Sequence, residues 1–340
     1  MRNYNQSILQ NTILYSTGFE DCIIDSVYFG GGTPSVYFEG GLGSVLNAVK
    51  ENYNLSDGCE ITAEANPESL TAEKANEWAC SGVNRVSIGL QSADAVLLKA
   101  VGRRHTYEGF LRAYENAVSA GIENISADIM LGLPEQTVKD VEDTIKVFYK
   151  LPFLRHLSVY ALKLEKGTPL YNRMTNGERQ IANDDEAADM YDTAYRLLKG
   201  YAFRRYEVSN FAKRGFECRH NLKYWNLEEY LGLGVSAHSY YGGKRYAFTN
   251  DINRFIAGEK PVCTELNDED RRTEYVMLKL RLNEGIFLDD YHKKFGTRLE
   301  AGEGAKFLLK HNMIGVSNGR LFVLPDKFYV MNSIIIKLLS

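Results

Sequence analysis

The sequence predicts an α/β protein built on a parallel β-sheet. Short apolar runs rich in β-branched residues alternate with amphipathic helical patterns from Asp25 to about Asn210. Such alternation requires crossover helices between parallel strands. Polar residues follow the apolar runs, which places them together at one edge of the sheet. An open doubly wound sheet and a barrel both satisfy this pattern.

The individual elements follow from local signals. Strands are expected at residues 26–29, 60–65, 85–90, 125–131, 156–162 and 205–208. A helix is expected after Thr137, because a threonine is a good N-cap and Asp140 three residues later resembles a capping box. Thr71 begins another helix, and Gly121 ends the helix that precedes the strand at 125.

The amino-acid composition changes after residue 210. Residues 211–264 are rich in Tyr, Gly, His and Asn and are expected to form a loop-rich connecting segment. Residues 265–340 predict a compact module with a helix ending near 282, helices at 288–295 and 299–312, and a hairpin at 315–323. That order resembles a winged helix. We therefore divide the chain into residues 1–210, 211–264 and 265–340.

Composition and charge limit the functional class. The chain has 340 residues, of which 44% are hydrophobic and 25% charged, and its net charge is -4. The C-terminal module holds 12 basic and 11 acidic residues, so its net charge is +1 and nucleic-acid binding is not favoured. It is instead expected to pack against the main domain.

The cysteines and the two ends of the chain predict the cellular compartment of the protein. The five cysteines are odd in number and widely spaced, as in a reduced cytoplasmic protein. Residues 1–16 predict an amphipathic helix and not a signal peptide, and the apolar run at 333–339 is too short to span a bilayer.

The residues after the strands predict a ligand pocket. Gly30, Gly31 and Gly32 form a turn after the first strand, where backbone can approach a small molecule closely. Glu64, Gln91 and Asp128 follow or close the next three strands. One such carboxylate can be a helix cap or a buried core residue, but three polar strand ends after a glycine turn favour a binding site.

These segments carry a family resemblance over nearly the whole chain. The motifs are GGGTPS at 30–35, EANPESL at 64–70, GLQS at 89–92, GRRHT at 102–106 and DIMLGLPEQT at 128–137. In this order and spacing they resemble the radical S-adenosylmethionine (SAM) family, in its coproporphyrinogen-dehydrogenase-like branch. The resemblance implies a partial (β/α)6 barrel with a small C-terminal winged-helix-like module.

Three further motifs are similar to the haem chaperones of that branch, the HemW type. They are YEVSNFA at 206–212, CRHNLKYW at 218–225 and YLGLGVSAHSY at 230–240. The H-N-x-x-Y-W element discriminates best, because the haem chaperones carry it and the porphyrinogen enzymes generally do not.

The resemblance implies roles for the matching residues. Gly30, Gly31, Gly32 and Thr33 would contact the amino-acid end of SAM, and Glu64 would accept hydrogen bonds from its amino group. Gln91, Arg103 and Asp128 would hold the sulfonium, the carboxylate or the ribose.

One element of the family is missing from this sequence. Its members carry a C-x-x-x-C-x-x-C motif that binds a [4Fe-4S] cluster, whereas Cys22 is the one cysteine upstream of the glycine turn. The first barrel strand and the cluster ligands are thus expected to be absent, either by truncation or in a natural degenerate form.

The favoured function is that of a haem chaperone that passes haem to an acceptor protein, with membrane-bound acceptors among the candidates. His220 is the first candidate for the haem contact, and Cys218, Tyr224 and Trp225 add a thiol and aromatic faces. Haem iron accepts His, Cys or Tyr, so the axial ligand stays open. His238 is a second candidate, although it could line the SAM pocket. Haem is expected to bind independently of SAM, since none of these residues belongs to the strand-end pocket.

Two alternatives remain. The first is an oxygen-independent coproporphyrinogen III oxidase, a radical SAM enzyme whose chemistry needs the cluster. The second is an inactive form of either protein, in which the pocket residues persist without use.

Overall fold

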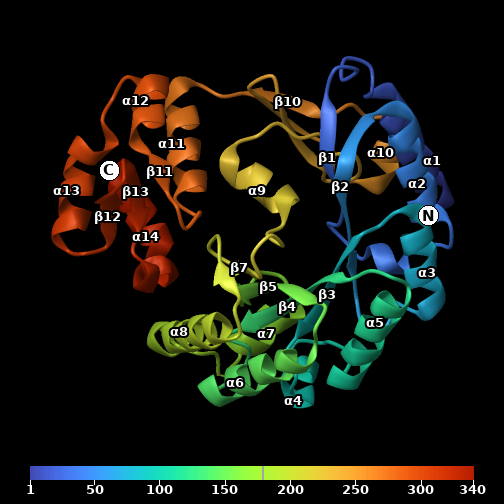
Figure 1. Cartoon of the computed structure of the whole chain (residues 1–340), viewed down its shortest axis with the longest axis horizontal. Helices are drawn as coiled ribbons and strands as arrows, with labels where there is room; N and C mark the ends of the chain where they lie inside the picture. The colour runs from blue at the N-terminus through green and yellow to red at the C-terminus, as the bar shows by residue number, and fades with distance from the viewer. Residues whose placement is uncertain (178–179) are drawn as a thin grey trace.

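A curled seven-stranded sheet forms the centre of the molecule (Figure 1). The computed structural model describes residues 1–177 and 180–340. The sheet order is β1-β2-β3-β4-β5-β7-β6, and β1 to β5 pair in parallel. These strands are β1 (Ile23–Phe29), β2 (Asn54–Ala65), β3 (Arg85–Gln91), β4 (Asn124–Leu131) and β5 (Leu154–Ala161). The predicted α/β half-barrel is confirmed.

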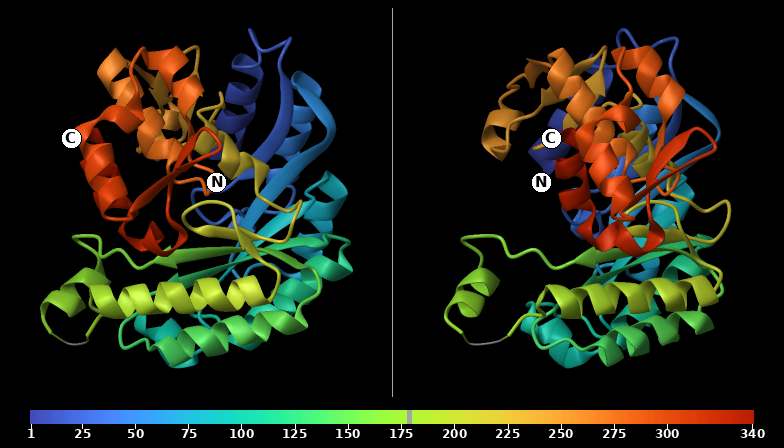
Figure 2. Two further views of the ribbon diagram at one scale, coloured as in Figure 1. Left: turned by 60° about the vertical axis from the view of Figure 1, so that its left-hand side comes forward. Right: turned by 90° about the vertical axis from the view of Figure 1, so that its left-hand side faces the viewer.

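Helices cover the outer side of the sheet, as Figures 1 and 2 show. They are α1 (Arg2–Leu14), α2 (Gly41–Asn52), α3 (Ala72–Ser81), α4 (Ala95–Ala100), α5 (Tyr107–Ser119), α6 (Val138–Lys146) and α8 (Asp184–Gly200). The short α7 (Pro169–Thr175) buries no residue and projects to one side in Figure 2. The main core lies between these helices and the strands, with Trp78, Phe110 and Ile125 fully buried. This burial is the main source of stability for the barrel.

Local capping interactions set where the helices begin. The Thr137 hydroxyl accepts a hydrogen bond from the Asp140 N–H, and the Asp140 carboxylate accepts one from the Thr137 N–H, so the predicted capping box before α6 is confirmed. Thr71 caps α3 in the predicted way. Caps of this kind satisfy N–H groups that the helix itself leaves unpaired.

The strand predicted at 205–208 is wrong. Two short strands take its place, β6 (Arg204–Arg205) and β7 (Asn210–Ala212), and β7 runs antiparallel to both β5 and β6. Glu207 lies in the turn between them, with its carboxylate accepting a hydrogen bond from the Ser209 N–H. The parallel order of the sheet therefore ends at β5.

The middle of the chain forms one helix and a small sheet. Helix α9 (Arg219–Asn226) lies on the concave side of the large sheet and contacts β1 (Figure 1). A separate antiparallel sheet follows, made of β8 (His238–Tyr241), β9 (Lys244–Ala247) and β10 (Val262–Glu265), with α10 (Ile252–Ile256) before its last strand.

The C-terminal residues form a helical module with a three-stranded sheet, in the order expected of a winged helix. Its elements are α11 (Asp268–Lys279), β11 (Ile286–Phe287), α12 (Leu288–Phe295), α13 (Glu303–Lys310), β12 (Ile314–Ser317), β13 (Arg320–Val323) and α14 (Met331–Leu339). The helix predicted at 299–312 is shorter, because its first residues form a 3-10 turn (Leu299–Ala301) and Gly302 is extended. The boundaries proposed at 210 and 264 stay a prediction.

Within the described ranges, none of the helices combines the length and the apolar character that a membrane crossing requires.

Candidate functional site

The concave face of the half-barrel is lined by polar side chains. Successive residues of a strand point to opposite faces, so every second residue shares a face. The polar residues at this period are Ser26 and Tyr28 on β1, Glu60, Thr62 and Glu64 on β2, Arg85 and Ser87 on β3, Ser126 and Asp128 on β4, and His156, Ser158 and Tyr160 on β5. Most of the alternate residues are apolar and belong to the core that packs under the helices. The sheet thus presents a hydrophilic interior to a ligand.

Glu64 and the glycine turn lie next to each other at the C-terminal ends of β1 and β2. The Tyr28 hydroxyl donates a 2.8 Å hydrogen bond to Glu64 Oε1. A Cβ on Gly30 would lie 2.5 Å from Tyr28 Cε1 and 2.8 Å from Glu64 Cδ, so no larger residue fits there. Burial raises the pKa of Glu64, and the Tyr28 hydrogen bond opposes that rise. A cationic ammonium group would favour the charged carboxylate here.

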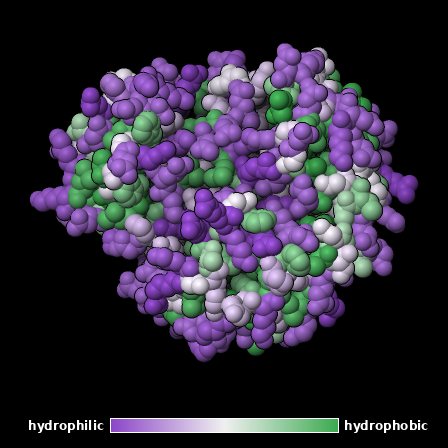
Figure 3. Space-filling model, viewed as in Figure 1, coloured by the Kyte–Doolittle hydropathy of each residue, from purple (hydrophilic) through white to green (hydrophobic). Residues whose placement is uncertain are grey.

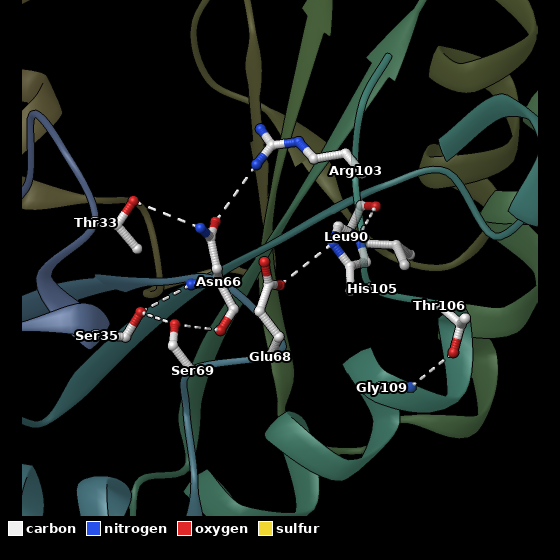
Figure 4. Close-up of polar contacts among 10 residues, drawn as sticks. All are labelled: Thr33, Ser35, Asn66, Glu68, Ser69, Leu90, Arg103, His105, Thr106 and Gly109. Carbon is white, nitrogen blue, oxygen red and sulfur yellow. Dashed lines mark hydrogen bonds and ion pairs between the residues drawn. The ribbon is translucent and has the colours of Figure 1, made fainter. Parts of the chain in front are cut away.

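A chain of polar contacts links the glycine turn to Arg103 through Asn66 (Figure 4). Asn66 Nδ2 lies 3.5 Å from Thr33 Oγ1, and Arg103 Nη1 lies 3.5 Å from Asn66 Oδ1. The Asn66 N–H donates to Ser35 Oγ at 3.1 Å, which fixes the loop. The structure therefore brings Thr33 and Arg103 together, with Asn66 as a connecting residue that the sequence reasoning missed.

Gln91 and Asp128 lie on neighbouring strands. Gln91 has a φ of 70° at an irregularity of β3, and its side-chain oxygen is buried without a hydrogen-bond partner. A non-glycine residue in this conformation is uncommon and is associated with functional sites. Ser87 Oγ donates to Asp128 Oδ1 at 3.1 Å, and burial raises the pKa of Asp128.

These observations match what SAM requires. The Glu64 carboxylate can accept hydrogen bonds from an ammonium group, and the Gln91 side-chain oxygen has no partner. Gly30 has no side chain where the turn lies closest to Tyr28 and Glu64. The other SAM-binding residues predicted from the sequence are Gly31, Gly32, Thr33, Arg103 and Asp128. Their contacts with SAM stay a prediction.

Replacing Glu64 with alanine should weaken SAM binding by about tenfold to a hundredfold, since a charge-assisted hydrogen bond contributes about 1.5–3 kcal/mol. Isothermal titration calorimetry of the two proteins measures this difference. Glu68→Ala is the matched control, because Glu68 is exposed and lies on the far side of Asn66 from Thr33 (Figure 4). Equal affinity of the wild type and Glu64→Ala would refute the pocket assignment.

Helix α9 lies in the same interior and packs against β1. Its N-terminus is fixed by the buried Glu60, whose carboxylate accepts hydrogen bonds from the Arg219 and His220 N–H groups at 3.2 Å each. Lys223 on the same helix forms a 2.9 Å ion pair with Asp25, which lies at the irregularity of β1. Negative charge at a helix N-terminus is stabilising, so Glu60 holds α9 in place.

The haem candidates on α9 differ in their accessibility. Cys218 is fully buried, its thiol lies 3.5 Å from Glu60 Oε1, and burial raises its pKa to about 11. Trp225 lies farther along the helix, with the Arg281 guanidinium 5.8 Å from its ring centroid. The structure thus separates a buried thiol at the start of α9 from the aromatic residues at its end.

His220 is held by three partners. Its Nδ1 lies 3.0 Å from Ser26 Oγ and its Nε2 lies 2.8 Å from the Tyr224 hydroxyl. Its ring stacks on Tyr28 with centroids 4.9 Å apart. Burial lowers the pKa of His220 to about 4, so the imidazole is neutral near pH 7. A neutral imidazole is the form that binds iron.

The expected independence of haem and SAM binding stays a prediction. Tyr28 contacts His220 through its ring and Glu64 through its hydroxyl, so one side chain connects the two candidate sites. No local pattern indicates this contact, because Ser26 on β1 and His220 on α9 are 194 residues apart. His238, in contrast, lies exposed on β8 of the separate small sheet.

A cleft of about 480 Å³ lies outside this interior, between the loop after β2 and the start of α5. Glu68, Arg104, His105 and Arg112 are among its lining residues. None of the predicted site residues lines it.

The residues present do not fit a [4Fe-4S] cluster. Across residues 1–177 and 180–340, no three His, Cys, Asp or Glu side chains are grouped in a way that could hold a metal ion. Cys22 is exposed, whereas Cys59 and Cys218 are buried.

Anaerobic reconstitution of this chain with iron and sulfide should consequently leave no stoichiometric iron, because three cysteine thiolates are needed to hold such a cluster. Iron analysis and visible absorption spectroscopy after desalting provide the measurement. A stable content of four irons and four sulfides per chain would show that the expectation is wrong.

The half-barrel fold, with a glycine turn and polar residues at its strand ends, is of the radical SAM type. The sequence profile described as the Radical SAM superfamily matches residues 17–148. The Escherichia coli coproporphyrinogen III oxidase HemN has a similar structure, with a TM-score of 0.84 over 99% of this chain and 82% of that one. Their sequence identity of 18% makes this a likeness of fold alone.

The sequence comparisons are more specific. The chain is 34% identical to the heme chaperone HemW of Lactococcus lactis over 94% of this chain and 86% of that protein. It is 35% identical to the heme chaperone HemW of Bacillus subtilis over 85% of this chain and 77% of that protein. The chain belongs to the HemW family of the radical SAM superfamily.

Proposed function

We propose that this chain is a haem chaperone, which binds haem at α9 and passes it to an acceptor protein. The observation that carries the proposal is the placement of His220, a neutral imidazole on the concave side of the barrel, in the H-N-x-x-Y-W element. The names of the HemW relatives support a haem cargo. The acceptor is a second protein, with membrane-bound proteins among the candidates.

In this proposal the imidazole of His220 is the axial ligand of the haem iron. Ser26 orients the ring by its contact with Nδ1, and Tyr28 supports its face. A second partner that fixes the ring is typical of a metal-binding histidine. Tyr224 and Trp225 offer aromatic surface to the porphyrin, and the buried Cys218 anchors the start of the helix.

SAM is the second ligand in this proposal. Gly30, Glu64, Gln91 and Arg103 would hold it, and when bound it supplies a cationic sulfonium and a reactive S–C bond. The chain's own residues bind and orient it, with Glu64 accepting hydrogen bonds and Tyr28 fixing the carboxylate. We assign no catalytic residue, since the cluster that would cleave SAM does not fit this chain. The protein acts as a carrier and not as an enzyme, in the cytoplasm.

The porphyrinogen oxidase reading receives less support, because the likeness to HemN rests on the fold at 18% identity.

Replacing His220 with alanine should weaken haem binding by about tenfold or more, because the axial bond is lost. Titration with haemin, followed by the Soret band, measures the affinity. His238→Ala is the matched control and should bind like the wild type, since His238 lies outside the barrel interior. Unchanged affinity and spectrum in His220→Ala, or a loss in His238→Ala alone, would overturn the site.

A further inference from the structure

The imidazole of His220 has no free nitrogen in this structure. Nδ1 contacts Ser26 Oγ at 3.0 Å, and Nε2 contacts the Tyr224 hydroxyl at 2.8 Å. An axial bond to iron requires a nitrogen lone pair. One of the two hydrogen bonds must therefore be given up before the proposed haem ligand can bind.

The two partners differ in how easily they can leave. Ser26 belongs to β1, which is paired with β2 along its length, and the His220 ring is stacked on Tyr28 of the same strand. Tyr224 lies four residues after His220 on α9, where residues at this spacing are neighbours on the helix surface. Rotation of the Tyr224 side chain uncovers Nε2, whereas Nδ1 lies against β1, on which the ring is held by its stacking with Tyr28.

The contacts also prepare Nε2 for metal binding. When Nδ1–H donates to Ser26 Oγ, Nε2 carries the lone pair and accepts from the Tyr224 hydroxyl. Iron-binding histidines donate their other N–H in this way. Tyr224 has a second packing partner, Tyr230, whose ring lies edge-on with centroids 4.6 Å apart. The Tyr224 ring can thus keep an aromatic contact when its hydroxyl leaves His220.

We propose that Tyr224 is a reversible mask of the axial ligand, whose hydroxyl occupies His220 Nε2 until iron replaces it and returns when haem leaves. This inference rests on the proposed function and specifies how the same site binds and releases its cargo. The mask competes with iron for one lone pair, so it lowers the affinity for haem and speeds its release. A carrier needs both properties.

The test compares Tyr224→Phe with the wild type. The variant keeps the ring and loses the hydroxyl, so it should bind haemin about threefold to tenfold more tightly, the equivalent of one hydrogen bond. It should also release haem to apomyoglobin more slowly by a similar factor, with an unchanged Soret maximum. Tyr230→Phe is the matched control, because it removes a nearby hydroxyl that accepts from Arg245 and does not contact His220.

A second measurement needs no haem. The ¹⁵N resonances of the His220 imidazole, assigned through the His220→Gln variant, should shift in Tyr224→Phe and stay unchanged in Tyr230→Phe. Weaker haem binding or a shifted Soret maximum in Tyr224→Phe would show that Tyr224 is itself a ligand and would overturn the mask. ¹⁵N resonances that do not shift in Tyr224→Phe would also overturn the mask. If His220→Ala binds haem with the wild-type affinity, the proposed haem site is wrong, regardless of the ¹⁵N result.

Discussion

Replacing Arg205 with alanine should lower the free energy of unfolding by about 3–5 kcal/mol, a large part of the stability of an ordinary domain. The buried guanidinium donates to Asn283 Oδ1, the Tyr191 hydroxyl and the Pro325 carbonyl, each at 3.1 Å. It also lies 3.4 Å from the centroid of the Phe328 ring. Charged hydrogen bonds contribute about 1.5–3 kcal/mol each and a desolvated cation–π contact about 2 kcal/mol, partly offset by the desolvation of the charge.

Arg205 joins three parts of the chain, because its partners lie on α8, after α11 and after β13. Its loss should loosen the C-terminal module as well as the barrel. Urea denaturation gives the free energy, and limited proteolysis reports whether the module becomes cleavable. Arg204→Ala is the control, since this neighbour is exposed and should change stability by less than about 0.5 kcal/mol. Equal losses in the two variants would contradict this account of Arg205.

Replacing Glu60 with leucine should destabilise the protein by about 2–4 kcal/mol and weaken haem binding at the same time. Glu60 accepts hydrogen bonds from the Arg219 and His220 N–H groups and from the Cys218 thiol. A buried donor that loses its acceptor costs about 1–3 kcal/mol. Helix α9 would also lose the negative charge at its N-terminus, so His220 would no longer be held against β1.

Glu60→Gln separates the two contributions, because glutamine keeps one acceptor oxygen and removes the charge. We expect its loss of stability to be about half that of the leucine variant. Haemin titration and urea denaturation of both variants are the measurements. Haem affinity that stays at the wild-type value in Glu60→Leu would mean that α9 does not need this anchor.

The local elements of the fold could be predicted because their signals are local. Leu288–Phe295 is a helix with the predicted bounds, and Thr71 and Thr137 cap the predicted helices. The failure at 205–208 has a long-range cause. Arg205 and Glu207 are buried, and β7 turns back to pair with β5, so the strand is divided by contacts that no local pattern contains.

The grouping of the strand-end residues could be predicted because parallel strands bring their ends to one edge of the sheet. Their role in binding SAM stays a prediction. The residues that support them were harder to find. Ser26, Tyr28 and Glu60 occur at alternate positions of β1 and β2, and this period-two polar pattern is the signal that indicates a hydrophilic barrel interior.

The position of α9 could not be predicted from any period. His220 and Tyr28 are far apart in the chain, and their stacking depends on the Glu60 hydrogen bonds and on the Lys223–Asp25 ion pair. The outer surface of this side of the molecule carries mostly hydrophilic residues with scattered hydrophobic ones (Figure 3).

The most direct test of a haem carrier is the amount of haem that stays with the chain when free haem is removed. The protein is mixed with haemin, passed through a gel-filtration column, and its haem is measured as the pyridine haemochrome. We predict about one haem per chain for the wild type and for His238→Ala, and a small fraction of that for His220→Ala, because one axial histidine holds one iron. Equal haem in His220→Ala and the wild type, or none in the wild type, would contradict the account.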